Sequence, residues 1–168
     1  MMLKKMTAAL LAAATMLSVG LVSCGDSSSS SGSSTSDSQS AGEAKDVSAV
    51  ADELKNGIEF KDSLNEIDPA VSEKLYKLTA DDYKSAKIYI GSGGATAEEI
   101  ACIEAKDADG VSKIEDAVKN RIEDLKTTFK DYVPEEMDKL NDPVIVIKGN
   151  SVYMCLSNDN AKAKEIIG

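Results

Sequence analysis

The sequence predicts an α+β domain, in which a small antiparallel sheet of about four strands packs against one long amphipathic helix, with short N- and C-terminal helices. Apolar residues recur with the 3.6-residue period of a helix between positions 111 and 132. Two β-prone runs, 144–147 and 152–156, are joined around Gly149 and Asn150, which is the pattern of a hairpin. These two observations predict the long helix and one hairpin of the sheet.

The first 23 residues have the order of a secretory leader, with Lys4 and Lys5 followed by a long apolar run. The leader ends in Leu21-Val22-Ser23-Cys24, which resembles the lipobox of bacterial prolipoproteins. The resemblance implies that Cys24 receives a diacylglycerol thioether and becomes the first residue after cleavage. The alternatives are an ordinary leader or an uncleaved membrane anchor. The apolar run is shorter than the roughly 20 residues of a spanning helix.

Residues 24–46 are expected to be the lipidated cysteine and a flexible tether. The stretch 27–40 is almost entirely serine and has nothing apolar to bury. A flexible chain of this length spans about 25 Å, and two acyl chains give stable attachment. We therefore expect a lipid anchor on the extracytoplasmic face of the cell membrane, with residues 47–168 forming a single α+β domain close to it.

Charge and composition exclude several partners and chemistries. The formal net charge is −10, and without the leader 17 basic residues face 29 acidic ones, a net charge of −12. Such a surface repels nucleic acid and anionic headgroups. The chain has no histidine and no tryptophan, so it lacks the commonest general base and zinc ligand. We expect no cofactor and no metal. Cys102 and Cys155 are expected to be buried thiols rather than a disulfide.

The first half of the domain is expected to hold two short helices and a strand. The first helix has apolar residues at three- or four-residue spacing over 47–58, and the second starts at Asp68-Pro69 and stops near Thr79. The second carries one apolar stripe, made of Val71, Leu75 and Leu78. A strand at 87–90 then ends in Gly91-Ser92-Gly93-Gly94. This run lacks the third glycine and the lysine of a phosphate loop, so it predicts a hairpin turn.

The second half is more regular, apart from residues 96–105, whose composition favours a helix but whose central apolar run suits a buried strand. Residues 107–110 predict a plain turn rather than a calcium loop. Ser112 and Glu115 form a capping-box pair for the long helix, with Asp109 as an alternative cap. The helix's stripe comprises Val111, Ile114, Val118, Ile122, Leu125, Phe129 and Tyr132. A last short helix is capped by Asn158 or Asp159.

The order of several segments resembles a family of small bacterial lipoproteins known only as domain of unknown function 4358, over roughly 69–167. The segments are Ala97-Glu98-Glu99-Ile100-Ala101, a helix with Arg121, Phe129, Tyr132, Pro134-Glu135-Glu136, Gly149-x-x-Val152 and Ser157-Asn158-Asp159. The resemblance implies that 97–105 is a strand. It implies no activity.

Two classes of function remain open. A non-enzymatic module that binds a protein, glycan or small ligand at the cell surface fits the tether and the lack of catalytic motifs. An extracytoplasmic hydrolase or metal-dependent enzyme requires carboxylates such as Glu98, Glu99, Asp107 and Asp109 to converge. No serine-hydrolase motif is present, and no residue is assigned as catalytic.

Arg121 is the only arginine among 19 basic residues, and it borders the apolar stripe of the long helix. A guanidinium suits such a half-buried position because it can bind a carboxylate through two parallel hydrogen bonds. We expect Glu98 or Glu99 as its partner, with Asp131 less favoured. The alternative is that Arg121 contacts an anionic ligand.

Overall fold

The computed structural model describes residues 44–168. The predicted leader, Cys24 and most of the predicted tether lie outside the described residues. The helices are α1 (Val47–Gly57), α2 (Pro69–Tyr76), α3 (Val111–Phe129), α4 (Met137–Asn141) and α5 (Asn160–Ile167), with 3-10 turns at Ala108–Gly110 and Pro134–Glu136. The strands are β1 (Leu64–Glu66), β2 (Tyr83–Gly91), β3 (Glu99–Ala105), β4 (Val144–Lys148) and β5 (Ser151–Leu156).

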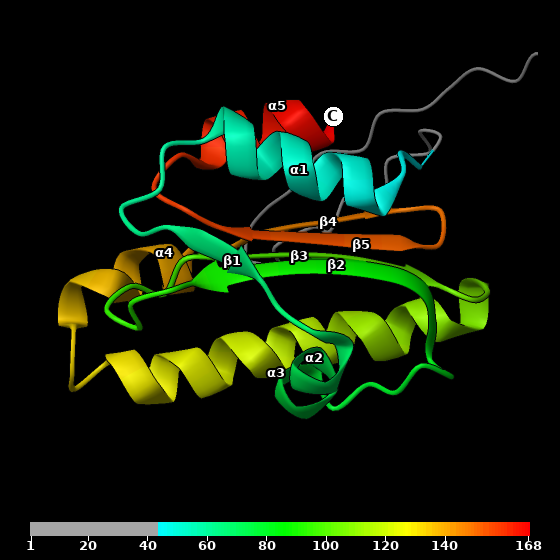
Figure 1. Cartoon of the computed structure of the whole chain (residues 1–168), viewed down its shortest axis with the longest axis horizontal. Helices are drawn as coiled ribbons and strands as arrows, with labels where there is room; N and C mark the ends of the chain where they lie inside the picture. Colours follow the sequence, from blue (N-terminus) through cyan, green and yellow to red (C-terminus); the bar gives the residue numbers. More distant parts are fainter. Residues whose placement is uncertain (1–43) are drawn as a thin grey trace, which may run out of the picture. The chain divides into compact units, whose positions relative to one another are not determined.

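The strands form one antiparallel sheet in the order β1-β2-β3-β5-β4 (Figure 1). The predicted α+β class is confirmed, and the sheet has five strands where about four were expected. The additional strand is β1, whose sequence Leu64-Asn65-Glu66 has no β pattern of its own. It forms because its backbone pairs with the end of β2.

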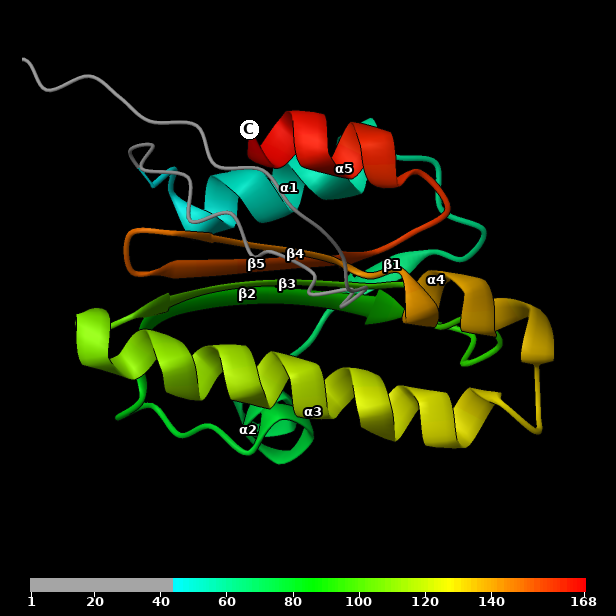
Figure 2. The ribbon, with the colours of Figure 1, turned by 180° about the vertical axis from the view of Figure 1, so that it is seen from behind.

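Helices cover both faces of this sheet (Figures 1 and 2). The long helix α3 and α2 lie on one face, and α1 and α5 lie on the other. Side chains alternate along a strand, so β3 contributes Ala101 and Ile103 to the core under α3, and Ile100 and Cys102 to the core under α1. The central strands β3 and β5 are therefore buried on both sides.

Residues 99–105 form β3, as the family resemblance implied and against their helical propensity. Backbone pairing on both sides explains the outcome, because β3 lies between β2 and β5. The glycine run at 91–94 closes β2 before the chain returns as β3, which confirms the predicted turn. Gly94 has a φ of +66°, which favours glycine.

The helix ends differ from the expectations at several positions. No side chain caps α3, so neither the Ser112–Glu115 box nor Asp109 acts as predicted; Asp107 instead accepts a hydrogen bond from the Gly110 N–H in the preceding turn. Tyr132 is 71 % exposed because α3 already ends at Phe129.

The stripe expected for α2 is wrong at Val71, which is 41 % exposed. Leu75 and Leu78 contact the core as expected, and Ser72 and Tyr76 complete the buried face. The helix ends at Tyr76, earlier than expected, because Lys77 adopts the left-handed conformation with a φ of +55°.

The hairpin of β4 and β5 has the predicted turn. Lys148 pairs with Ser151 across Gly149 and Asn150, and only Gly149 has a positive φ, +54°. Positive φ at the first of the two turn residues is the pattern of a type II′ turn.

Both Cys102 and Cys155 are buried, and both thiols are free. In the register of the sheet Cys102 lies opposite Tyr153, and Cys155 lies opposite Ile100, so the two cysteines are diagonal neighbours. Diagonal positions are about 7–8 Å apart, which exceeds the usual reach of a disulfide. Burial raises the pKa of both thiols, that of Cys155 to about 12.

Asp159 and Asp68 occupy equivalent positions at the starts of α5 and α2, but only the carboxylate of Asp159 accepts a backbone hydrogen bond, from the Lys162 N–H at 2.9 Å. We expect Asp159→Ala to lower the free energy of unfolding by about 1 kcal/mol. Asp68→Ala is the matched control and should lower it by much less. Urea unfolding measures both, and equal losses would contradict the assignment of the cap.

Candidate functional site

Arg121 binds Glu99 with the fork of its guanidinium. Its Nη2 donates to Glu99 Oε2 at 2.7 Å, and its Nε lies 3.1 and 3.2 Å from the two carboxylate oxygens. The Tyr76 hydroxyl donates a short hydrogen bond to the same carboxylate. The side chain of Arg121 is 14 % exposed and that of Glu99 is 2 % exposed. Glu99 is thus neutralised inside the layer between the sheet and α3.

Each partner reaches this pair from a different element. Glu99 is the first residue of β3 and lies on the face toward α3, two residues before Ala101. Arg121 lies near the middle of α3, and Tyr76 is the last residue of α2. Burial raises the pKa of Tyr76, and the nearby Glu99 charge raises it further, so the hydroxyl stays protonated and donates. The cluster ties two helices to the sheet.

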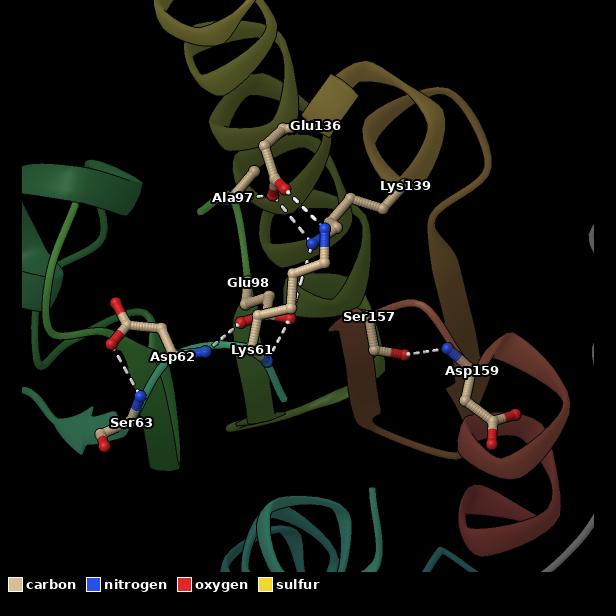
Figure 3. Close-up of polar contacts among 9 residues, drawn as sticks. All are labelled: Lys61, Asp62, Ser63, Ala97, Glu98, Glu136, Lys139, Ser157 and Asp159. Carbon is tan, nitrogen blue, oxygen red and sulfur yellow. Dashed lines mark hydrogen bonds and ion pairs between the residues drawn. The ribbon is translucent and has the colours of Figure 1, made fainter. Parts of the chain in front are cut away.

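Glu98 lies in a second cluster rather than beside Arg121. Its two carboxylate oxygens accept hydrogen bonds from the backbone N–H groups of Lys61 and Asp62, each at 2.9 Å. Lys139 Nζ lies 3.5 Å from Oε1, and both side chains are almost fully buried. Figure 3 shows how these groups face one another at the end of the sheet. Glu98 therefore joins the segment after α1 to α4.

Glu136 completes this second cluster. Its Oε2 lies 2.8 Å from Lys139 Nζ and accepts the backbone N–H of Ala97 at 2.8 Å, and Lys61 Nζ lies 3.6 Å from Oε1. Lys139 meets both carboxylates as ion pairs, without a hydrogen bond of good geometry. Two carboxylates thus face two ammonium groups. The ammonium group of Lys139 is buried, whereas the Lys61 side chain is 57 % exposed.

Asp62 fixes the glycine turn beside this cluster. Its carboxylate accepts the backbone N–H of Gly93 at 2.6 Å and the Ser92 hydroxyl at 3.1 Å. A Cβ at Gly91 or Gly93 would lie 3.1 Å from Asp62 Oδ2, so both positions favour glycine. The turn that resembled a phosphate loop is therefore occupied by a carboxylate of the chain itself.

Polar groups also gather on the surface of α1. Asp52 accepts from Lys87 Nζ at 2.8 Å and from the Tyr89 hydroxyl at 2.5 Å. Lys55 Nζ lies 4.4 Å above the Tyr89 ring, a cation–π distance. The hydrogen bonds from Lys87 and Tyr89 lower the pKa of Asp52, and Asp52 raises that of Lys87.

Two open hollows flank the end of α1. One, of about 460 Å³, lies between α1 and α5 and is lined by Asp52, Glu53, Asn56, Gly57, Lys162 and Ile166. The other, of about 370 Å³, is lined by Lys55, Ile58, Phe60, Asp62, Ser63 and Leu64. Both offer charged and apolar groups together. Both have room for a small ligand or a partner side chain.

The four carboxylates considered for an enzyme do not converge. Glu98 and Glu99 lie at the start of β3 in separate clusters, whereas Asp107 and Asp109 are exposed beyond its end, about 20 Å away along a strand of seven residues. Within residues 44–168, no three cysteine, aspartate or glutamate side chains gather in a way that could hold a metal ion.

Sequence reasoning named Arg121, Glu98 and Glu99 as site residues but not Lys139, and it named Glu136 only within a segment of the family resemblance. The pair has the three-residue spacing of a helical ion pair, but such spacing is common on exposed helices and carries no sign of burial. Asp131, the less favoured partner of Arg121, lies in the exposed turn after α3. Whether Arg121 has only a structural role or also contacts a ligand remains a prediction.

We expect Arg121→Lys to lower the free energy of unfolding by about 1–3 kcal/mol, because an ammonium cannot bind both oxygens of the buried Glu99. Lys119→Arg, an exchange at an exposed position of the same helix, is the control and should change it by less than about 0.5 kcal/mol. Denaturant titration measures both variants. An unchanged midpoint for Arg121→Lys would instead favour a ligand-binding role.

We expect Lys139→Met to lower the free energy of unfolding by about 3 kcal/mol or more at neutral pH, since it leaves Glu98 and Glu136 buried without their shared cation. Lys61→Met is the control, because Lys61 is 57 % exposed and contributes less.

The same variant tests a pH dependence. Burial raises the pKa of Glu136, but Lys139 and the Ala97 N–H lower it more, so it lies below the ordinary value of 4.5. A carboxyl group whose pKa is lower in the folded chain than in the unfolded chain stabilises the fold at pH values above the unfolded pKa. This stabilisation is lost as the pH falls through the folded-state pKa. The difference between wild type and Lys139→Met should therefore narrow below about pH 4.5. Equilibrium unfolding at neutral and acid pH measures this difference, and a constant difference would contradict the role of Glu136.

Comparison with known proteins gave a family model, "Domain of unknown function (DUF4358)", matching residues 56–157. The match runs from the end of α1 to the residue after β5 and includes both buried clusters. Neither a curated protein nor a solved structure matched the chain. Because the family model covers more than half of the sequence, the chain belongs to the DUF4358 family.

Proposed function

We propose that this protein is a lipoprotein, held on the extracytoplasmic face of the cell membrane by lipid on Cys24, whose domain is a non-enzymatic binding module. The observation that carries the anchor is the sequence Leu21-Val22-Ser23-Cys24 after a basic and apolar leader. In residues 44–168 no helix has the length and apolar character needed to cross a membrane.

The arrangement of charges supports the non-enzymatic part of the proposal. A general acid or base needs an ionisable group that can exchange a proton with a substrate. Glu98, Glu99 and Glu136 instead accept hydrogen bonds from the chain's own backbone or side chains. Both buried thiols have raised pKa values, so they are poor nucleophiles at neutral pH.

The hollows beside α1 are the places where we expect a ligand or partner to bind. They combine apolar side chains, such as Phe60 and Ile166, with charged groups of both signs, such as Glu53 and Lys55. This mixture is typical of sites that bury an apolar group and orient it with a few polar contacts.

The anchor is tested with Cys24→Ser in the full chain. We expect this variant to lose the diacylglycerol mass and to leave the membrane fraction or remain unprocessed, because no thiol is available at position 24. Ser23→Ala keeps a small residue before the cysteine and is the matched control. Normal processing and membrane retention of Cys24→Ser would refute the anchor.

The non-enzymatic role is tested by thermal unfolding with millimolar Mg²⁺, Ca²⁺, Mn²⁺ or Zn²⁺. A metal that binds the folded state raises its stability. We expect no rise in the melting temperature, since the buried carboxylates are already neutralised by lysine, arginine and backbone N–H groups. A saturable rise that Glu98→Gln or Asp107→Asn abolishes would favour a metal-dependent enzyme.

A further inference from the structure

The two edges of the sheet differ in how they are protected. The edge strand β1 has three residues, two of them polar. The other edge, β4, is Val144-Ile145-Val146-Ile147-Lys148, directly preceded by Pro143, with no bulge and with no charge before the buried Lys148. Prolines, bulges and charges protect the edges of natural sheets. Between Pro143 and Lys148, the four apolar residues of β4 carry none of these devices and are suited to pairing with another strand.

The register of the hairpin shows which backbone groups of β4 face outward. In a hairpin closed by a two-residue turn, the residues that flank the turn form a hydrogen-bonded pair, and such pairs then alternate. Lys148, Val146 and Val144 therefore bond to β5, whereas the N–H and C=O groups of Ile145 and Ile147 point away from it. No hydrogen bond from any described residue reaches these outward groups.

We propose that β4 is an interface between two copies of this chain, which pair antiparallel about a two-fold axis at Val146. In this register Ile145 of one copy lies opposite Ile147 of the other, and each such pair exchanges two hydrogen bonds. All four outward N–H groups and all four outward C=O groups of the two strands are then satisfied, and the two sheets become one.

The ends of β4 favour the antiparallel arrangement over a parallel one. Asp142, which precedes the strand, is exposed, whereas the Lys148 ammonium at the other end is buried and donates to the Ile167 and Gly168 carbonyls. Antiparallel pairing places the two Asp142 carboxylates at opposite ends of the joined strands, whereas in-register parallel pairing would bring these like charges side by side. The side chains of Ile145 and Ile147 pack against the core under α3 and would extend that apolar surface across the axis.

The chain's own preceding segment is a poorer occupant for this edge. The described chain begins at Ala44, which lies beside Gly149 at one end of β4. The residues before it, Ser36-Asp37-Ser38-Gln39-Ser40-Ala41-Gly42-Glu43, include no β-branched or aromatic residue, the types enriched in strands. A second β4, with three consecutive β-branched residues after Val144, fits the edge better.

The test is disulfide cross-linking of the full chain in intact cells. At a two-fold axis Val146 lies opposite its own copy in a non-hydrogen-bonded pair, with Cα atoms about 4.5 Å apart, within the reach of a disulfide. We expect Val146→Cys to give a covalent homodimer with a mild oxidant. The unsubstituted chain shows the background from its own cysteines.

Two matched variants show whether the two strands pair in the proposed register. Val144→Cys lies on the same face of β4 but opposite Lys148 of the other copy, so it should not cross-link to itself. Thr127→Cys is exposed on α3 and reports random collisions. Thermal melting of each variant checks the fold.

The proposal is overturned if Val146→Cys gives no more covalent dimer than the unsubstituted chain and Thr127→Cys. It is also overturned if Val144→Cys gives as much dimer as Val146→Cys, or if Val146→Cys cross-links only to a different protein. The cross-link does not depend on lipid at Cys24, so its result is separate from the test of the anchor.

Discussion

The fold depends on the burial of two successive carboxylates at the start of β3. Because successive side chains of an extended chain point in different directions, Glu98 and Glu99 cannot share one cation. Glu99 is neutralised by Arg121 from α3 and by Tyr76 from α2, and Glu98 by Lys139 and two backbone N–H groups. A buried charge without a partner is costly. The positions of α2, α3, α4 and the segment after α1 are therefore coupled to one point of the sheet.

The same two glutamates show how far sequence reasoning extends. The isolated arginine on the border of an apolar stripe was enough to predict a carboxylate partner and to narrow it to Glu98 or Glu99. Choosing between them needs the strand register and the direction of α3, which are tertiary properties. Lys139 and Glu136 have no comparable signal, because lysine and glutamate three residues apart are ordinary on exposed helices.

The elements were predicted well wherever the local pattern agreed with the tertiary environment. The long helix has an apolar period of 3.6 residues, and the β4–β5 hairpin joins two β-prone runs around Gly149-Asn150; both formed where expected. Strand β1 has no β-type sequence pattern, because its edge position imposes none. Helix α2 ends early because Lys77 adopts a left-handed conformation that no local rule assigns to lysine. Residues 99–105 follow their pairing with two neighbours rather than their propensity.

The contacts of Lys45 have a mechanical consequence. Its carbonyl accepts the Tyr153 hydroxyl at 2.6 Å, and its Nζ donates to the Ile166 carbonyl at 2.7 Å. A force applied through the residues before Ala44 is thus shared between β5 and α5 before it reaches the first turn of α1. These two bonds must break before α1 can peel from the sheet. A domain loaded in this way withstands tension at its N-terminal end by distributing it over elements that are remote in sequence.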